Sequence, residues 1–147
     1  MKAIKLNTLI KYIFLGVITI TIVLSLNSCA TKVNFLTSSV VPAARGQVKI
    51  KRDHNKNYVI QVNLVNLAEV KRLQTSKQTY VVWMVTDQEI TKNIGQLNSS
   101  TSLFSGKLTA SFETVSSFKP IKVFITAEDN SNTQYPGDQL VLTTDRF

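Results

Sequence analysis

Short runs in which apolar and polar residues alternate recur along residues 46–144, and they constrain the fold most strongly. Two of them, GQVKIKR at residues 46–52 and YVIQVNLV at residues 58–65, flank the polar turn DHNKN. A period of two places the apolar side chains on one face of an extended strand, so this pair predicts a β-hairpin. Further strands are expected at residues 107–114, 121–127 and 139–144, with a shorter one near residues 94–97.

The segment TYVVWMV, residues 79–85, is apolar at positions that point to both faces of a strand. Such a run is typical of a central strand that is covered on each side. The polar residues Thr86 and Asp87 end it. We expect Trp83 to anchor the core.

About seven short strands separated by turn residues, without a segment of sustained helical period, indicate an all-β fold. We predict an immunoglobulin-like antiparallel β-sandwich over residues 46–147, with a single helical turn at residues 68–73. A domain of about 100 residues that is rich in β-branched side chains buries enough surface to fold without disulfides.

Residues 1–28 have the pattern of a secretory signal. Three lysines lead, and the uncharged apolar stretch YIFLGVITITIVLSL follows at residues 12–26. A stable membrane-spanning helix needs about 20 apolar residues, and this run stops at Leu26. A signal peptide is therefore the favoured interpretation, with a single-pass membrane anchor as the alternative because Lys11 could snorkel.

The only cysteine, Cys29, ends the tetrapeptide LNSC. This tetrapeptide resembles the lipobox of bacterial lipoproteins: Leu26 is apolar and Ser28 is small, although Asn27 departs from the commonest pattern. The resemblance implies a diacylglyceryl group on the Cys29 sulfur, cleavage before Cys29 and acylation of the new amino group. Several acyl chains exceed the two-signal threshold for stable anchoring. A lone thiol in a secreted chain has no intramolecular partner, which agrees with its modification.

Residues 29–45, the cysteine and the segment that follows it, mix Ser, Thr, Ala and Pro without a sustained period. We expect a largely irregular tether that lets the domain stand off the bilayer, from which Val33, Phe35 and Leu36 could dock on the domain. No acidic residue lies between Cys29 and Asp53. In lipoproteins an acidic residue directly after the cysteine signals inner-membrane retention, so the resemblance implies an anchor at the periplasmic face of the outer membrane.

Roughly the last 75 residues resemble the extracytoplasmic C-terminal domain of anti-sigma-K-type factors. In that family a Tyr-x-x-Trp strand leads to a polar turn and a Gly-Gln or Gly-Thr step, and a later strand ends in a Glu-rich loop with a Pro-Gly turn. The matching positions are Tyr80, Trp83, Gly95, Glu128, Pro136 and Gly137. Those factors carry a sigma-binding helical domain before their membrane segment, whereas eleven residues precede the apolar run here. The resemblance implies the sandwich without sigma-factor sequestration.

Residues with catalytic potential are few. His54, the only histidine, lies in a charged turn, and no nucleophile in a recognisable setting accompanies it. There is no Gly-rich phosphate loop, serine elbow or His/Cys metal spacing. The chain is basic, with a formal net charge of +8, but nucleic acid is not an expected partner outside the cytoplasm. We predict a non-enzymatic envelope module for binding or sensing, without cofactor or metal; an enzyme of unrecognised type is the remaining alternative.

The connection AEDNSNTQYPGD, residues 127–138, is the predicted binding loop. Its candidate binding residues are Glu128, Asp129, Tyr135 and Asp138. Oxygen-rich loops can coordinate Ca²⁺, but the spacing does not match an EF-hand loop, and a solvated turn is favoured. Tyr135 has two interpretations: it is exposed and contacts an envelope protein, or it folds back and caps the core.

Lys49, Lys51, Arg52 and Lys56 form a basic cluster around the predicted hairpin. Alternation places Lys49 and Lys51 on its solvent face. Lysines at such positions could guard an exposed edge strand against pairing with another chain. The other interpretation is an attraction to anionic lipid or to an acidic partner.

Overall fold

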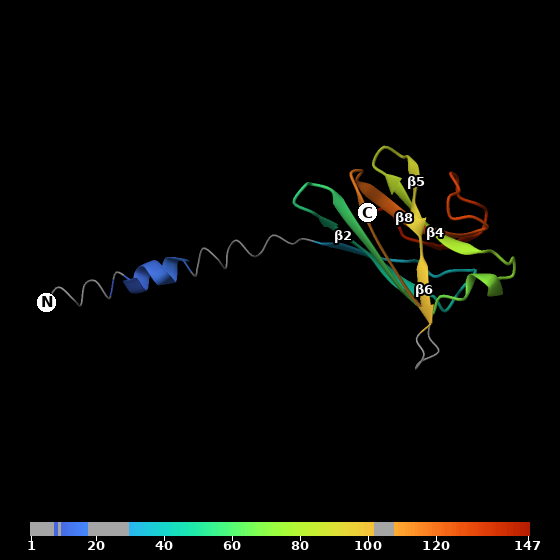
Figure 1. Cartoon of the computed structure of the whole chain (residues 1–147), viewed down its shortest axis with the longest axis horizontal. Helices are drawn as coiled ribbons and strands as arrows, with labels where there is room; N and C mark the ends of the chain where they lie inside the picture. The colour runs from blue at the N-terminus through green and yellow to red at the C-terminus, as the bar shows by residue number, and fades with distance from the viewer. Residues whose placement is uncertain (1–7, 9, 18–29, 102–107) are drawn as a thin grey trace.

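The computed structural model describes residues 8, 10–17, 30–101 and 108–147, and from residue 30 on its regular elements are strands and one short 3-10 helix (Figure 1). The elements are β1 (Thr31–Asn34), β2 (Arg45–Arg52), β3 (Tyr58–Val65), the 3-10 helix η1 (Val70–Arg72), β4 (Thr79–Thr86), β5 (Thr91–Gln96), β6 (Asn98–Thr101), β7 (Leu108–Ser116), β8 (Pro120–Glu128) and β9 (Leu140–Thr143). The predicted strands and the predicted helical turn are confirmed.

The strands form two antiparallel sheets. One sheet has the order β1-β2-β3-β7-β6, and the other has the order β5-β4-β8-β9. The prediction of an all-β, two-layer architecture is therefore confirmed.

The β2–β3 hairpin shows why the alternating runs fold as they do. Val48 lies opposite Val62 and Ile50 lies opposite Ile60, and all four side chains are buried. The polar turn between the strands is closed by Asp53, whose Oδ1 accepts a hydrogen bond of 2.8 Å from the backbone N–H of Asn57. An Asp side chain that binds the backbone in this way stabilises a tight turn.

The central strand β4 is buried on both faces, as its sequence predicts. Tyr80, Val82 and Met84 belong to the hydrophobic core. Successive side chains of a strand point to opposite faces, so Trp83 lies on the outer face of its sheet. Trp83 is fully buried, but it lies outside the core cluster that it was expected to anchor.

The expectation of a largely irregular tether is wrong for residues 31–35. Strand β1 pairs with β2 from Thr31, which lies opposite Ile50. Phe35 continues to the other sheet, where it forms a bridge with Thr144, and its side chain is only 8% exposed. An unpaired sheet edge and an apolar side chain both favour this docking, which alternation over four residues is too short to reveal.

The arrangement of β2 also corrects the interpretation of its lysines as guards of an edge strand. Strand β2 lies between β1 and β3. Both of its edges are therefore occupied, and edge protection does not explain Lys49 and Lys51.

The sandwich has two distinct ends. Strand β1 begins beside the β2–β3 turn. Strand β7 ends at this same end, because its last residue, Ser116, lies opposite Tyr58, which follows the turn. The next strand, β8, therefore also begins there. Strand β8 runs to the opposite end, where Glu128 pairs with Thr79. We call the first the β1 end and the second the β8 end.

The residues before the sandwich are described in part. Residues 10–17 are helical. Within the described ranges, no helix is long and apolar enough to cross a membrane. Cys29, the predicted lipidation site, and most of the predicted signal lie outside the described residues.

Candidate functional site

The predicted binding loop joins β8 to β9, and we call residues 129–139 the β8–β9 loop. From the β8 end, the loop folds across the outer face of its sheet. Asn93 of β5 is the cross-strand partner of Trp83. Its amide Nδ2 donates hydrogen bonds to the carbonyl oxygens of Ser131 and Thr133, at 2.8 and 2.9 Å. The loop therefore lies over the face that carries Trp83.

A chain of hydrogen bonds connects the buried Trp83 to Gly137, near the end of the β8–β9 loop. The indole Nε1 of Trp83 donates to Thr126 Oγ1 at 2.8 Å, and the Thr126 hydroxyl donates to Glu128 Oε1 at 2.5 Å. The same Glu128 oxygen accepts the backbone N–H of Gly137 at 2.7 Å. Trp83 also stacks on Phe124, with ring centroids 6.1 Å apart. The strands β4 and β8 thus fix the position of the loop.

Gly137 lies close to the Glu128 carboxylate. A Cβ atom at position 137 would lie 2.8 Å from Glu128 Oε2 and 3.2 Å from Oε1. A side chain at this position would therefore require the Glu128 carboxylate to shift. The predicted Pro-Gly bend therefore has a packing role in addition to its role in the turn.

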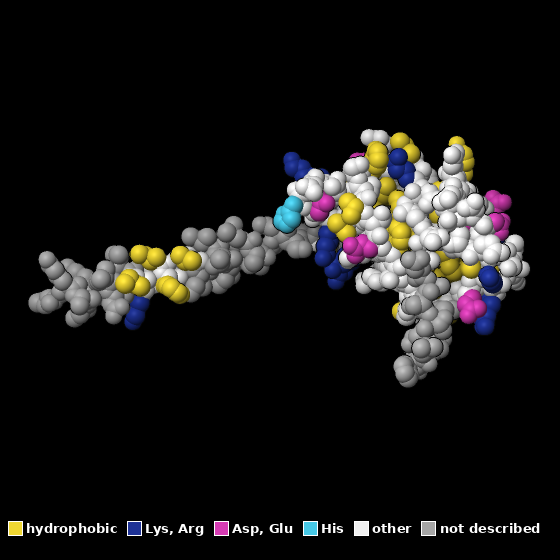
Figure 2. All heavy atoms as spheres, viewed as in Figure 1, with side chains coloured by type: hydrophobic (Ala, Val, Ile, Leu, Met, Phe, Trp, Pro, Cys, Tyr) yellow, Lys and Arg dark blue, Asp and Glu magenta, His cyan; other side chains and the backbone are white. Residues whose placement is uncertain are grey.

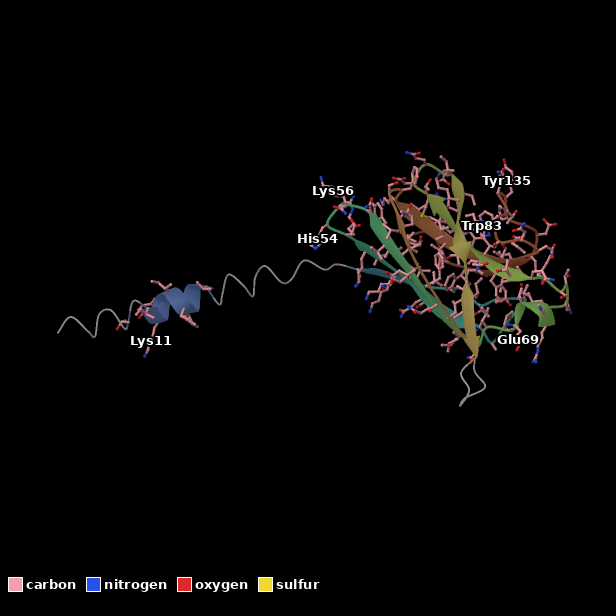
Figure 3. The ribbon with its side chains drawn as sticks, viewed as in Figure 1. Lys11, His54, Lys56, Glu69, Trp83 and Tyr135 are labelled. Atoms are coloured by element: carbon pink, nitrogen blue, oxygen red, sulfur yellow. The ribbon has the colours of Figure 1, made fainter. Side chains whose placement is uncertain are left out.

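The four candidate binding residues occupy two kinds of position. Glu128 is 7% exposed and supports the loop from below. Asp129 is exposed, and its carboxylate accepts a hydrogen bond of 2.7 Å from Lys77 Nζ, an interaction that raises the pKa of Lys77. Asp138 is exposed. Tyr135 is 79% exposed and points away from the sheet, so it does not cap the core (Figure 3).

Three supporting residues were missed by sequence reasoning. Asn93 lies about 40 residues before the carbonyls that it binds, Lys77 lies 52 residues before Asp129, and Thr126 is one of several threonines in the strands. The only sequence signal is that Thr126 is a polar position between apolar residues. Such a signal does not indicate which side chains meet.

A groove runs beside the β8–β9 loop at the β8 end. Its volume is about 800 Å³, and it is lined by residues 39–43, residues 137–139 and parts of the segment 68–77. Lys77 and Asp138 contribute charges of opposite sign to its lining. The groove offers a partner a lining of mixed polar and apolar residues, and Tyr135, two residues before Gly137, adds an exposed aromatic side chain on the same loop.

His54 lies at the β1 end of the sandwich, whereas the β8–β9 loop starts at the β8 end. His54 is exposed at the β2–β3 turn, and Figure 3 places it at the opposite end of the domain from Glu69. Among the described residues, no group of three or more His, Cys, Asp or Glu side chains is placed to hold a metal ion.

No family model, curated protein or solved structure matches this chain. Of the residues that carry the resemblance to anti-sigma-K-type factors, Trp83, Glu128 and Gly137 lie in the buried chain of hydrogen bonds. Tyr80 lies in the core and donates its hydroxyl to the carbonyl of Ala68 at 3.0 Å.

Proposed function

We propose that this protein is a lipid-anchored, non-enzymatic module of the cell envelope that binds or senses a partner protein through the β8–β9 loop. The anchor is Cys29, at the periplasmic face of the outer membrane. The domain is immunoglobulin-like and related in form to the extracytoplasmic domain of anti-sigma-K-type factors.

The strand order supports the immunoglobulin-like assignment. Strands β2-β3-β7-β6 and β5-β4-β8-β9 correspond to the ABED sheet and to the CFG sheet with an added C′ strand. Two features differ from antibody domains. Trp83 faces outward from its sheet, and Cys29 is the only cysteine, so no bridge joins the sheets.

The exposure of Tyr135 is the observation that carries the binding function. Its ring is 79% exposed on a loop that Asn93 and Glu128 hold against the sheet. A tyrosine has few rotatable bonds and offers both apolar area and a hydroxyl, so it gives contact area at a small entropic cost. Loops held by a rigid scaffold are where binding residues concentrate. The loop starts at the β8 end, away from the anchored β1 end, and it is therefore open to a partner in the envelope.

In-cell photo-crosslinking tests this proposal. A photoreactive phenylalanine derivative replaces Tyr135 in one variant and Gln88, an exposed residue of the β4–β5 turn, in a matched control. We expect one defined protein adduct from position 135 that is absent from position 88. Its yield should fall when Asp138→Ala is added, because Asp138 is the exposed acidic neighbour of the bend.

The stability of Tyr135→Ala provides the second readout. Substitution of an exposed residue changes the free energy of unfolding by less than about 0.5 kcal/mol, so failure of this variant to co-purify with the crosslinked partner, at an unchanged unfolding midpoint, isolates binding. No adduct at position 135, or the same adduct from both positions, contradicts the proposal.

A further inference from the structure

Three lysines share the outer face of the five-stranded sheet, and we call Lys32, Lys49 and Lys51 the lysine face. Lys32 of β1 lies directly opposite Lys49 of β2. Lys51 lies two residues further along β2 and therefore on the same face. Figure 2 shows Lys and Arg side chains gathered at the edge of the domain where its described chain begins.

This arrangement opposes folding. Like charges directly opposite each other on neighbouring strands are destabilising. The charge of Lys51 and its close contact with Lys49 lower the pKa of Lys49, and Lys32 adds to this effect. Among the described residues, none of the three lysines forms an ion pair. The repulsion is therefore not relieved within the described part of the chain.

Two carboxylates lie near this row, Asp53 two residues beyond Lys51 and Glu113 across the sheet. The Asp53 carboxylate accepts hydrogen bonds from the backbone N–H and the side-chain amide of Asn57 in the β2–β3 turn. Lys49 lies opposite Gln61, and Gln61 in turn lies opposite Glu113. Two strand spacings, about 10 Å, separate Lys49 from Glu113, and the Glu113 carboxylate accepts a hydrogen bond of 2.7 Å from the Gln61 amide. Glu113 thus does not neutralise the lysine face.

The position of the lysine face in the chain indicates what relieves the repulsion. Strand β1 begins at Thr31, two residues after Cys29. Lys32 lies three residues after Cys29, and three residues span at most about 10–11 Å. The Debye length at physiological ionic strength is about 8 Å. If Cys29 is anchored in a bilayer, Lys32 lies close enough to interact with its headgroups.

We infer that the lysine face is a docking surface for the anionic phospholipid headgroups of the membrane that holds the anchor. This inference rests on the proposed anchor at Cys29. The lysine face lies against the bilayer, where its lysines meet negative charge, and the β8–β9 loop, which covers the outer face of the other sheet, is turned away from it. Each lysine near an anionic surface strengthens the attraction about fivefold.

Lipid crosslinking with the mature, lipidated protein, residues 29–147, tests the inference. A photoreactive residue replaces Gln47, which is exposed on the same face two residues before Lys49; the matched control replaces Thr75, exposed at the β8 end. The protein is reconstituted in vesicles of phosphatidylcholine alone or mixed with phosphatidylglycerol. We expect lipid adducts at position 47 to be at least fivefold more abundant in the anionic vesicles, and those at position 75 to be unchanged.

Charge variants test whether the lipid contact depends on the charge of the three lysines or on the shape of the surface. Replacing all three lysines with glutamine should remove the dependence on phosphatidylglycerol, and replacing them with arginine should retain it. The glutamine variant loses only mutual repulsion, so its thermal midpoint should not fall. Adducts at position 47 that are independent of lipid charge, or unchanged in the glutamine variant, overturn the inference.

The anchor and the lysine face have separate readouts. Flotation of the protein with phosphatidylcholine vesicles reports the anchor alone, because these vesicles carry no net charge. In one outcome flotation fails, but adducts at position 47 still form only with phosphatidylglycerol and only when the three lysines are present. That outcome contradicts the proposed anchor and supports the lysine face as a docking surface. If flotation succeeds without charge-dependent adducts, the anchor stands and the lysine face is wrong.

Discussion

Glu128 and Gly137 lie nine residues apart and are joined by a hydrogen bond of 2.7 Å from the Gly137 N–H to Glu128 Oε1. This bond closes the β8–β9 loop onto the end of β8. The carboxylate is buried and also receives the Thr126 hydroxyl. The conformation that exposes Tyr135 thus depends on one buried acidic side chain.

Glu128→Ala should lower the free energy of unfolding by about 2–3 kcal/mol, because hydrogen bonds to charged groups contribute about 1.5–3 kcal/mol and the Gly137 and Thr126 donors lose their acceptor. Urea denaturation measures the change. Asp129→Ala removes only an exposed ion pair and should cost less than about 1 kcal/mol. Equal losses in the two variants would show that Glu128 does not hold the loop.

Trp83→Ala should cost about 3–5 kcal/mol, the range for truncation of a buried large aromatic. Trp83→Phe keeps a ring on Phe124 but removes the Nε1–H donor to Thr126, and it should cost less. Because Trp83 lies under the β8–β9 loop, Trp83→Ala should also increase cleavage within residues 129–139 by limited proteolysis. Unchanged cleavage would contradict this placement of Trp83.

A domain that begins at residue 38 should be less stable than one that begins at residue 30 by about 3–5 kcal/mol, because it lacks β1 and the buried ring of Phe35. Thermal and urea unfolding of the two forms measure the difference. Phe35→Ala in the longer form should reproduce most of it. Two forms of equal stability would show that β1 and Phe35 do not stabilise the domain, as expected of an irregular tether.

Tyr80 should make stability depend on pH in the alkaline range. Burial raises its pKa to about 12, against about 10 in the unfolded chain. The folded state holds the proton more tightly, so this contribution is fully present below pH 10 and is lost as the pH rises from about 10 to 12. Tyr80→Phe should show a shallower decline in unfolding free energy over this window; an identical decline would exclude Tyr80 as its source.

Cys29→Ser should abolish acylation and move the protein out of the membrane fraction, because the thioether needs the sulfur atom. Intact-mass measurement of the membrane form should show the loss of residues 1–28 and the added acyl groups. If the variant stays in the membrane at full length, a spanning helix is the better account of the N-terminal segment.

The sequence by itself determined most of the strands of the domain, although not β1. Strand β3 occupies residues 58–65, as alternation predicts, and the β2–β3 hairpin forms as expected. Both features depend on neighbouring residues: period-two alternation sets the strand faces, and Asp53 binds a backbone group four residues away. The burial of β4 on both faces was also readable, because a run of apolar residues must be covered on each side.

The tertiary structure decided which elements lie next to one another and which face each side chain uses. Alternation assigns a strand two faces but does not say which one meets the other sheet, so Trp83 was assigned to the core although it lies beneath the loop. Asn93 meets its carbonyl partners about 40 residues away, and β1 lies beside β2. These pairings arise when the whole chain buries its apolar surface and satisfies its backbone groups at once. Long-range contacts of this kind leave no local pattern in the sequence.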